Sequence, residues 1–170
     1  MRCKSGHFTK YEQSYYFCCM QPLNLPSYSF SIKHIDRHKK EIFDAYRKKF
    51  VALTPEEWLR QNFLRFLTET KGYPVSLLAV EKGLQVQKRQ RRFDAVAYGT
   101  DGKPLMLMEF KAPEVNITQK TFEQIAAYNQ LLKVKYLIVS NGLKHYCCFI
   151  DFKKNKILFL NNIPTFDTLE

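Results

Sequence analysis

The chain has 170 residues, of which 45% are hydrophobic and 25% charged, a composition typical of a globular domain and not of a fibrous or disordered protein. Its formal net charge is +11, with the excess of lysine and arginine in the first two-thirds of the chain. Such a charge attracts polyanions, nucleic acid above all, although solubility alone is a sufficient alternative. No apolar run reaches the roughly 18 residues of a membrane span, so we expect no membrane association.

The cysteines predict a reducing environment. There are five of them, two pairs are adjacent, and none has the C-x-x-C spacing of a zinc knuckle. The N-terminus also shows no hydrophobic segment followed by a small-residue cleavage site, so we expect no signal peptide. Both features favour a cytoplasmic protein.

Residues 1–19 differ from the remainder, because they are polar, rich in tyrosine and cysteine, and without periodicity. We interpret them as a non-native or disordered extension, with Met20 as the physiological start in place of Met1. Intact-mass measurement on natively expressed protein distinguishes the two starts. Residues 20–53 are then an N-terminal arm, and residues 54–170 the main domain.

The arm is predicted to contain a short helix. Ile42, Phe43, Tyr46 and Phe50 recur at helical spacing and indicate an amphipathic helix over residues 38–50.

A longer helix is predicted to begin after Thr54. Thr54 is a favourable N-cap, Pro55 suits the first helical position, and Glu57 completes a capping box. The expected apolar face of this helix consists of Trp58, Leu59, Phe63, Phe66 and Leu67, and Gly72-Tyr73-Pro74 ends it.

The following elements alternate in a way that predicts an α/β fold with a mixed sheet. A second helix is expected from about Thr118 to Leu132, with Thr118 as its cap. The expected strands cover Ser76–Val80, Arg92–Tyr98, Leu105–Lys111, Lys135–Ser140, His145–Asp151 and Ile157–Leu160.

Two of these strands form a hairpin whose register can be predicted. Asp101-Gly102 is a strong signal for a two-residue type I′ turn. Centring the turn there makes residue 98 face 105, residue 96 face 107, and Asp94 face Glu109. A loop longer by one residue would break this pairing.

The predicted register places the Cβ atoms of these two acidic residues about 5 Å apart on one sheet face. Lys111 lies on the same face, roughly 7 Å along the strand from Glu109. Two carboxylates and a nearby carbonyl, that of Phe110, suit a hard divalent ion such as Mg²⁺. The alternative is that Asp94 and Glu109 are strand-end charges that reach solvent.

These motifs resemble the PD-(D/E)XK nuclease superfamily. The resemblance lies in Arg92-Phe93-Asp94-Ala95-Val96-Ala97 and Met108-Glu109-Phe110-Lys111-Ala112-Pro113. Gln124-Ile125-Ala126-Ala127-Tyr128-Asn129 looks like the Q-x-x-x-Y motif of the N-terminal nuclease domain of type I restriction enzyme R subunits. The resemblance covers roughly residues 54–165 and implies a restriction-endonuclease-like core, a mixed central sheet flanked by helices in αβββαβ order.

The resemblance also implies roles for the motif residues. Asp94 and Glu109 would bind Mg²⁺, for which Mn²⁺ would substitute, and Lys111 would position or activate the attacking water. Gln124 and Tyr128 are four apart and would share the helix face that points at the site, although a surface amide and a half-buried aromatic are the alternative. An acidic residue of the first helix would complete the site, with Glu57 the first candidate and Glu56 the second, although the capping box alone is a sufficient reason for Glu57.

Together these features predict a Mg²⁺-dependent deoxyribonuclease domain that hydrolyses phosphodiesters, with endonuclease and exonuclease action both open. DNA contacts are expected from the basic cluster Lys88, Arg89, Arg91 and Arg92. No G-x-x-x-x-G-K-[ST] motif is present, so we expect no helicase motor, and a motor or specificity subunit would act in trans. The alternatives are a catalytically inactive DNA-binding or adaptor module with the same fold, and an interaction domain whose charge is incidental.

Overall fold

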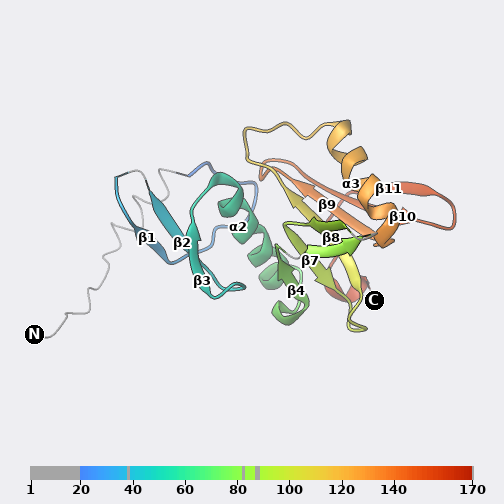
Figure 1. Ribbon diagram of the computed structural model, residues 1–170, viewed down its shortest axis with the longest axis horizontal. Coiled ribbons are helices and arrows are strands. Elements are labelled where there is room, and N and C mark those ends of the chain that lie inside the picture. Colours follow the sequence, from blue (N-terminus) through green and yellow to red (C-terminus); the bar gives the residue numbers. More distant parts are fainter. Residues whose placement is uncertain (1–19, 38, 82, 87–88, 170) are drawn as a thin grey trace, which may run out of the picture.

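A computed structural model describes residues 20–37, 39–81, 83–86 and 89–169. The interpretation of residues 1–19 as an extension therefore lies outside the described residues. The described chain begins with an extended segment and a three-stranded antiparallel sheet of β1 (Ile32–His34), β2 (Lys40–Asp44) and β3 (Lys49–Ala52) (Figure 1).

The prediction of a helix over residues 38–50 is wrong, because residues 40–52 form the β2–β3 hairpin. The carboxylate of Asp44 accepts hydrogen bonds from the backbone N–H groups of Tyr46 and Arg47, at 2.8 and 3.1 Å, and so fixes a turn. Lys48 completes the turn with a positive φ of 52°. The apolar residues then alternate across the strands, with Ile42 buried and Phe43 exposed. A local side-chain hydrogen bond thus favours the turn over the helix that the spacing suggested.

Helix α2 (Pro55–Thr70) follows the three-stranded sheet and confirms the predicted start. The hydroxyl oxygen of Thr54 accepts a hydrogen bond from the backbone N–H of Glu57 at 3.1 Å. The second half of the predicted capping box is not formed, because the carboxylate of Glu57 binds Arg47, Arg60 and Gln61 instead.

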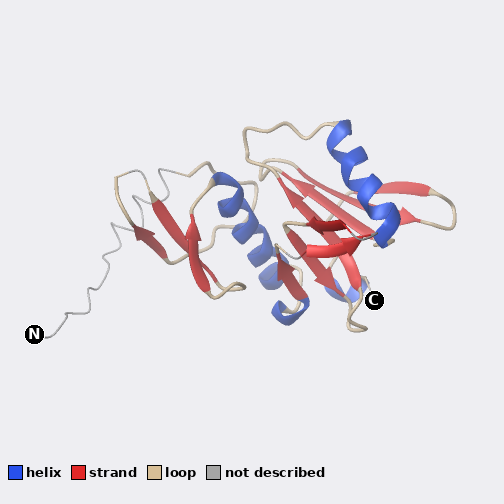
Figure 2. Ribbon diagram, viewed as in Figure 1, coloured by secondary structure: helices blue, strands red, loops and turns tan. Residues whose placement is uncertain are grey.

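The central sheet has six strands in the order β11-β10-β9-β8-β7-β4 (Figure 2). Strands β8 and β9 are parallel and the other neighbours are antiparallel. The order α2, β4, β7, β8, α3, β9 along the chain confirms the predicted αβββαβ core. A separate hairpin of β5 and β6, which the sequence did not predict, is inserted between β4 and β7. The bounds are η1 Val75–Leu77, β4 Leu78–Val80, β5 Gly83–Val86, β6 Arg89–Arg92, β7 Ala95–Tyr98, β8 Pro104–Phe110, α3 Gln119–Leu132, β9 Tyr136–Ser140, β10 His145–Asp151, β11 Lys156–Leu160 and η2 Phe166–Thr168.

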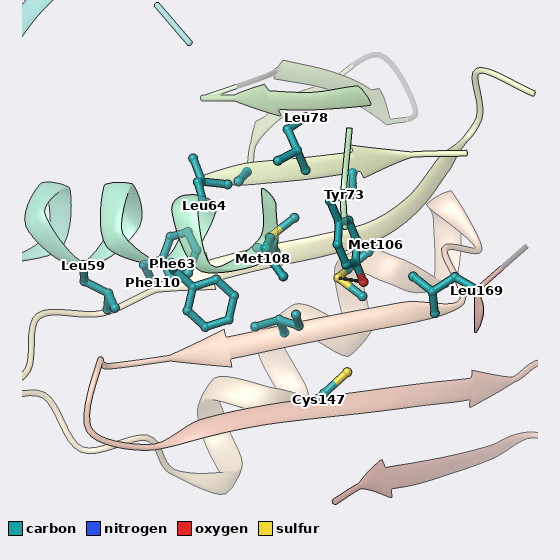
Figure 3. Packing of buried hydrophobic residues seen from close by; sticks show 14 residues of the cluster. Leu59, Phe63, Leu64, Tyr73, Leu78, Met106, Met108, Phe110, Cys147 and Leu169 are labelled. Atoms are coloured by element: carbon teal, nitrogen blue, oxygen red, sulfur yellow. Dashed lines mark hydrogen bonds between the residues drawn. The ribbon is translucent and has the colours of Figure 1, made fainter. Parts of the chain in front are cut away.

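Each face of the central sheet packs against one helix, which gives three layers (Figure 1). On one face, Phe63 of α2 packs in a cluster with Met106, Met108 and Phe110 of β8 (Figure 3). On the other face, Leu107 of β8 packs with residues of α3. Burying side chains of this size stabilises the fold by about 1.5–3 kcal/mol each. Alternate residues of β8 thus belong to two cores, one on each face of the sheet. Glu109 lies at the C-terminal end of this strand.

Helix α2 lies between the three-stranded sheet and the central sheet (Figure 1). No helix among the described residues is long and apolar enough to cross a membrane.

Candidate metal centre

The β7–β8 hairpin brings Asp94 and Glu109 to the same end of the central sheet. The pairs Ala95 with Met108 and Val96 with Leu107 confirm the predicted register for the part of the ladder next to Asp94. Asp94 lies in a bend directly before β7, and Glu109 is the penultimate residue of β8. The two carboxylates are therefore neighbours at the end of the ladder.

The turn reaches this register by a different route from the predicted one. Asp101 has no positive φ, so the turn is not type I′, and Gly102 alone adopts the left-handed conformation at 74°. The carbonyl of Gly99 accepts from the N–H of Gly102, and Gly99 pairs with Lys103 across a three-residue loop. Tyr98 then pairs with Pro104, which corrects the predicted pairing of residues 98 and 105. A bulge between Ala97 and Tyr98 absorbs the extra residue and restores the register at the carboxylates.

The carboxylate of Asp94 is held in a partly buried, strongly perturbed position. Its Oδ2 atom accepts a hydrogen bond from the backbone N–H of Phe110 at 2.7 Å, and its carbonyl accepts one from the N–H of Glu81 at 3.0 Å. Burial, followed by the negative charge of Glu109, raises the pKa of Asp94 from 3.8 to about 6. The hydrogen bond from Phe110 and the charge of Lys111 act against this rise without cancelling it. Asp94 thus faces negative charge that its neighbours compensate only in part.

Glu109 and Lys111 form an ion pair on the sheet face that α3 covers. Glu109 pairs with Val139 of β9, whose side chain belongs to the core on that face. The ammonium of Lys111 donates to Oε1 of Glu109 at 2.7 Å, and the two side chains are 30% and 24% exposed. Burial alone would lower the pKa of Lys111, but the hydrogen bond and charge of Glu109, with Asp94 and Glu56, raise it. Lys111 is therefore a cation throughout the physiological range.

A small pocket lies between the start of α2 and Asp94. It has a volume of about 130 Å³ and is lined by Thr54, Glu56, Glu57, Arg60, Glu81, Asp94 and Phe110. The charge of Glu56 acts on both Asp94 and Lys111. The carboxylate of Glu57 is instead bound by Arg47, Arg60 and Gln61. Both candidates in α2 therefore line the pocket, with the carboxylate of Glu57 bound by two arginines and the charge of Glu56 acting on Asp94.

The remaining predicted residues are placed only by their backbone. Gln124 and Tyr128 lie in α3, the helix on the face that carries Glu109. Arg89, Arg91 and Arg92 belong to β6, the second strand of the β5–β6 hairpin, whereas Lys88 lies outside the described residues. Their contacts with substrate stay predictions.

The donor set fits a hard divalent cation. Within residues 20–37, 39–81, 83–86 and 89–169, no three histidine, cysteine, aspartate or glutamate side chains are close enough to enclose a metal ion. Mg²⁺, however, is usually held by one or two carboxylates, with water and substrate phosphate completing its shell. Asp94 and Glu109 supply two such carboxylates, whose mutual repulsion a divalent cation would relieve.

The sequence did not predict the ion-pair network behind this site. Asp44, Arg47, Glu57, Arg60 and Glu81 are joined by salt bridges, two of them at 2.7 Å and one at 2.8 Å. Asp44 is fully buried, and Arg60 is only 4% exposed. These residues come from three segments, 44–47, 57–60 and 81, and no spacing in the sequence indicates that the three segments meet.

Comparisons with known proteins agree with this fold. A family model described as the type I restriction enzyme R protein N terminus matches residues 55–164, nearly two-thirds of the chain. A fragment structure assigned to an HsdR subunit of a type I restriction enzyme from Vibrio vulnificus YJ016 superposes with a TM-score of 0.51 at 21% identity. The superposition covers 69% of this chain and 24% of that one, so the chain spans about a quarter of that fragment. A search of curated proteins gave no significant match.

Proposed function

Because the chain belongs to the family of type I restriction enzyme R protein N-termini, we propose that it is a Mg²⁺-dependent DNA nuclease domain. The observation that supports this most is the convergence of Asp94, Glu109 and Lys111 at one end of the β7–β8 hairpin. Two acids and a lysine in this arrangement serve phosphodiester hydrolysis, because that reaction develops negative charge and needs an activated water.

Each residue of the site would have a separate role in the reaction. Asp94 and Glu109 would hold Mg²⁺, with Mn²⁺ as a substitute, and Glu56 would add negative charge from α2. The bound ion would supply positive charge for the phosphate and a more acidic water. The hydrogen bond from the backbone of Phe110 orients the carboxylate of Asp94. Lys111, cationic and held by Glu109, would stabilise the charge on the phosphate oxygens and orient the attacking water.

DNA is the substrate that the charge of the chain favours. The net charge is +11, and β6 contributes three arginines in four residues. Positive charge of this kind neutralises phosphates without regard to sequence. The relative of known structure is a type I restriction enzyme subunit, so we propose that a motor or specificity subunit works with this domain, in the cytoplasm.

The second candidate is a DNA-binding or adaptor module that does not cut. The same positive charge supports this second candidate, since binding to DNA phosphates requires no metal ion. Binding would then fall steeply with salt and would be indifferent to Mg²⁺.

Cleavage of supercoiled and linear DNA, with Mg²⁺, Mn²⁺ or EDTA, tests the proposal. We expect cleavage only with a divalent ion, and a loss of about 100-fold or more in Glu109→Ala and Lys111→Ala. Lys103→Ala is the matched control, because Lys103 forms an exposed ion pair at the opposite end of the same hairpin. A wild type inactive with every metal, or variants that cut as well as wild type, would reject the nuclease and leave the binding module.

A further inference from the structure

Arg47, in the turn between β2 and β3, binds three carboxylates at once. Its Nε contacts Asp44, its Nη2 lies 2.8 Å from Glu57, and its Nη1 lies 2.7 Å from Glu81. The three acids come from β2, α2 and the residue after β4. Only a guanidinium offers nitrogens in a planar fork that can serve three acceptors together. Arg47 therefore joins the three-stranded sheet to two walls of the pocket beside Asp94.

Arg60 is the partner of Arg47 in this network. It contacts Asp44 at 2.7 Å and also Glu57, and it is 96% buried by side chain. Removing Arg47 would leave Arg60 alone against Asp44 and Glu57, and would take from Glu81 its ion pair with Arg47. Loss of a partner is costly for the buried carboxylate of Asp44 and the largely buried carboxylate of Glu57, so the acids would move.

Glu81 carries the connection from Arg47 to Asp94. Its side chain binds Arg47, and its backbone N–H donates to the carbonyl of Asp94 at 3.0 Å. Glu81 also has a φ of 49°, a left-handed conformation that residues other than glycine seldom adopt. Contacts at both ends of Glu81 offset the cost of this conformation. The pair Val80 and Ala95 ends the β4–β7 ladder beside it, so the hydrogen bond from Glu81 to Asp94 continues the contact between the two strands by one residue.

We propose that Arg47 is a positioning residue for Asp94, acting through Glu81. The three-stranded sheet, whose β2–β3 turn carries Arg47, would therefore contribute to the geometry of the proposed metal site. Arg47 lies outside residues 55–164, the part of the chain that the family model matches. The inference deepens the proposed function and rests on it only for the effect on cleavage. The effect on the backbone at Asp94 follows from the contacts alone.

Amide hydrogen exchange by NMR, paired with cleavage kinetics, tests the proposal on the full chain. The informative amides are those of Glu81 and Phe110, because both donate to Asp94. The amide of Ile138 in β9 reports global opening. The variants are Arg47→Ala and Glu81→Gln. The second keeps the size of a side chain that is 34% exposed and so preserves the fold even where the first does not.

Arg65→Ala is the matched control. Arg65 also joins the N-terminal segment to α2, through a 2.6 Å hydrogen bond to the carbonyl of Ser29. Its ion pair is with Glu69, which is not part of the network of Asp44, Arg47, Glu57, Arg60 and Glu81. We expect both test variants to lose protection at Glu81 and Phe110 by about tenfold or more relative to Ile138, and the control to lose none. In an active nuclease, kcat should fall by about 10-fold to 100-fold with KM for DNA nearly unchanged.

The outcomes separate the two proposals. An inactive wild type whose variants still lose protection selectively would reject the nuclease and retain the positioning role. Equal loss at Glu81, Phe110 and Ile138 would make Arg47 a contributor to global stability only and would overturn the inference. Unchanged protection at Glu81 and Phe110 would overturn it as well, whatever the cleavage rate.

Discussion

Replacing Asp94 by asparagine should stabilise the metal-free protein while it removes the proposed activity. The pKa of Asp94 is raised from 3.8 to about 6, by burial first and the charge of Glu109 second. The folded state thus holds a proton that the unfolded state has released, and the free energy of unfolding falls as pH rises from about 4 to about 6. At about 1.4 kcal/mol for each pH unit, ionised Asp94 costs up to about 3 kcal/mol above pH 7. Asparagine keeps an acceptor for the N–H of Phe110 and carries no charge.

Urea denaturation without divalent ions measures this gain. At pH 8, Asp94→Asn should be more stable than wild type by about 1–3 kcal/mol, or about 2–10 °C in Tm. Near pH 4 the difference should shrink below about 1 kcal/mol, because the wild-type carboxyl is then protonated in the folded protein. Glu109→Gln is a useful companion, since it removes the second cause of the raised pKa. A variant no more stable than wild type at pH 8, or a gain independent of pH, would refute the reasoning.

Three further predictions concern the helices and the basic hairpin. Thr54→Ala should cost about 1 kcal/mol in urea denaturation and Thr54→Ser almost nothing, because only the hydroxyl cap of α2 matters; equal losses would refute the cap. Asn129→Ala should cost about 2 kcal/mol or more, since the buried amide of Asn129 bonds both the N–H and the carbonyl of Val134, and an unchanged denaturation midpoint would contradict this. Arg89→Ser with Arg91→Ser should weaken DNA binding and make the slope of log affinity against log salt less negative by about 2, as fluorescence anisotropy would show; an unchanged slope would exclude phosphate contacts there.

The order of the core elements could be predicted from sequence because its signals are local. Thr54 and Pro55 mark the start of α2, and Asn141-Gly142 ends the buried strand β9. The segment 38–50 shows the opposite case. Its apolar residues fit a helix by spacing, but the carboxylate of Asp44 caps a turn and is in turn buried against Arg60. That second contact is sixteen residues away in sequence, so no local pattern contains it.

For the candidate site, the sequence predicted the β7–β8 hairpin and its register beside Asp94, but not the ion pairs around it. The signal at Asp101-Gly102 gave the correct register beside Asp94, although the turn is a three-residue loop corrected by a bulge. The loop is one residue longer than predicted, and the bulge between Ala97 and Tyr98 compensates for that residue. The sequence indicates neither feature. The preference for Glu57 over Glu56 stays a prediction, because both line the pocket beside Asp94. The sequence did not indicate that the carboxylate of Glu57 binds Arg47, since this ion pair joins residues that come together only in the folded chain.

The electrostatics of Asp94 also bear on whether the domain cuts DNA or only binds it. A module that only grips phosphates gains nothing from a buried carboxylate with a pKa near 6, since the negative charge repels DNA and costs stability. A neutral amide at position 94 would preserve the contact with Phe110 and remove both penalties. Asp94 is instead an acid beside Glu109, and Glu81, in a left-handed conformation, donates its backbone N–H to the carbonyl of Asp94. A bound cation would neutralise the uncompensated negative charge at this point, which is the reason that we favour the proposed nuclease over the adaptor.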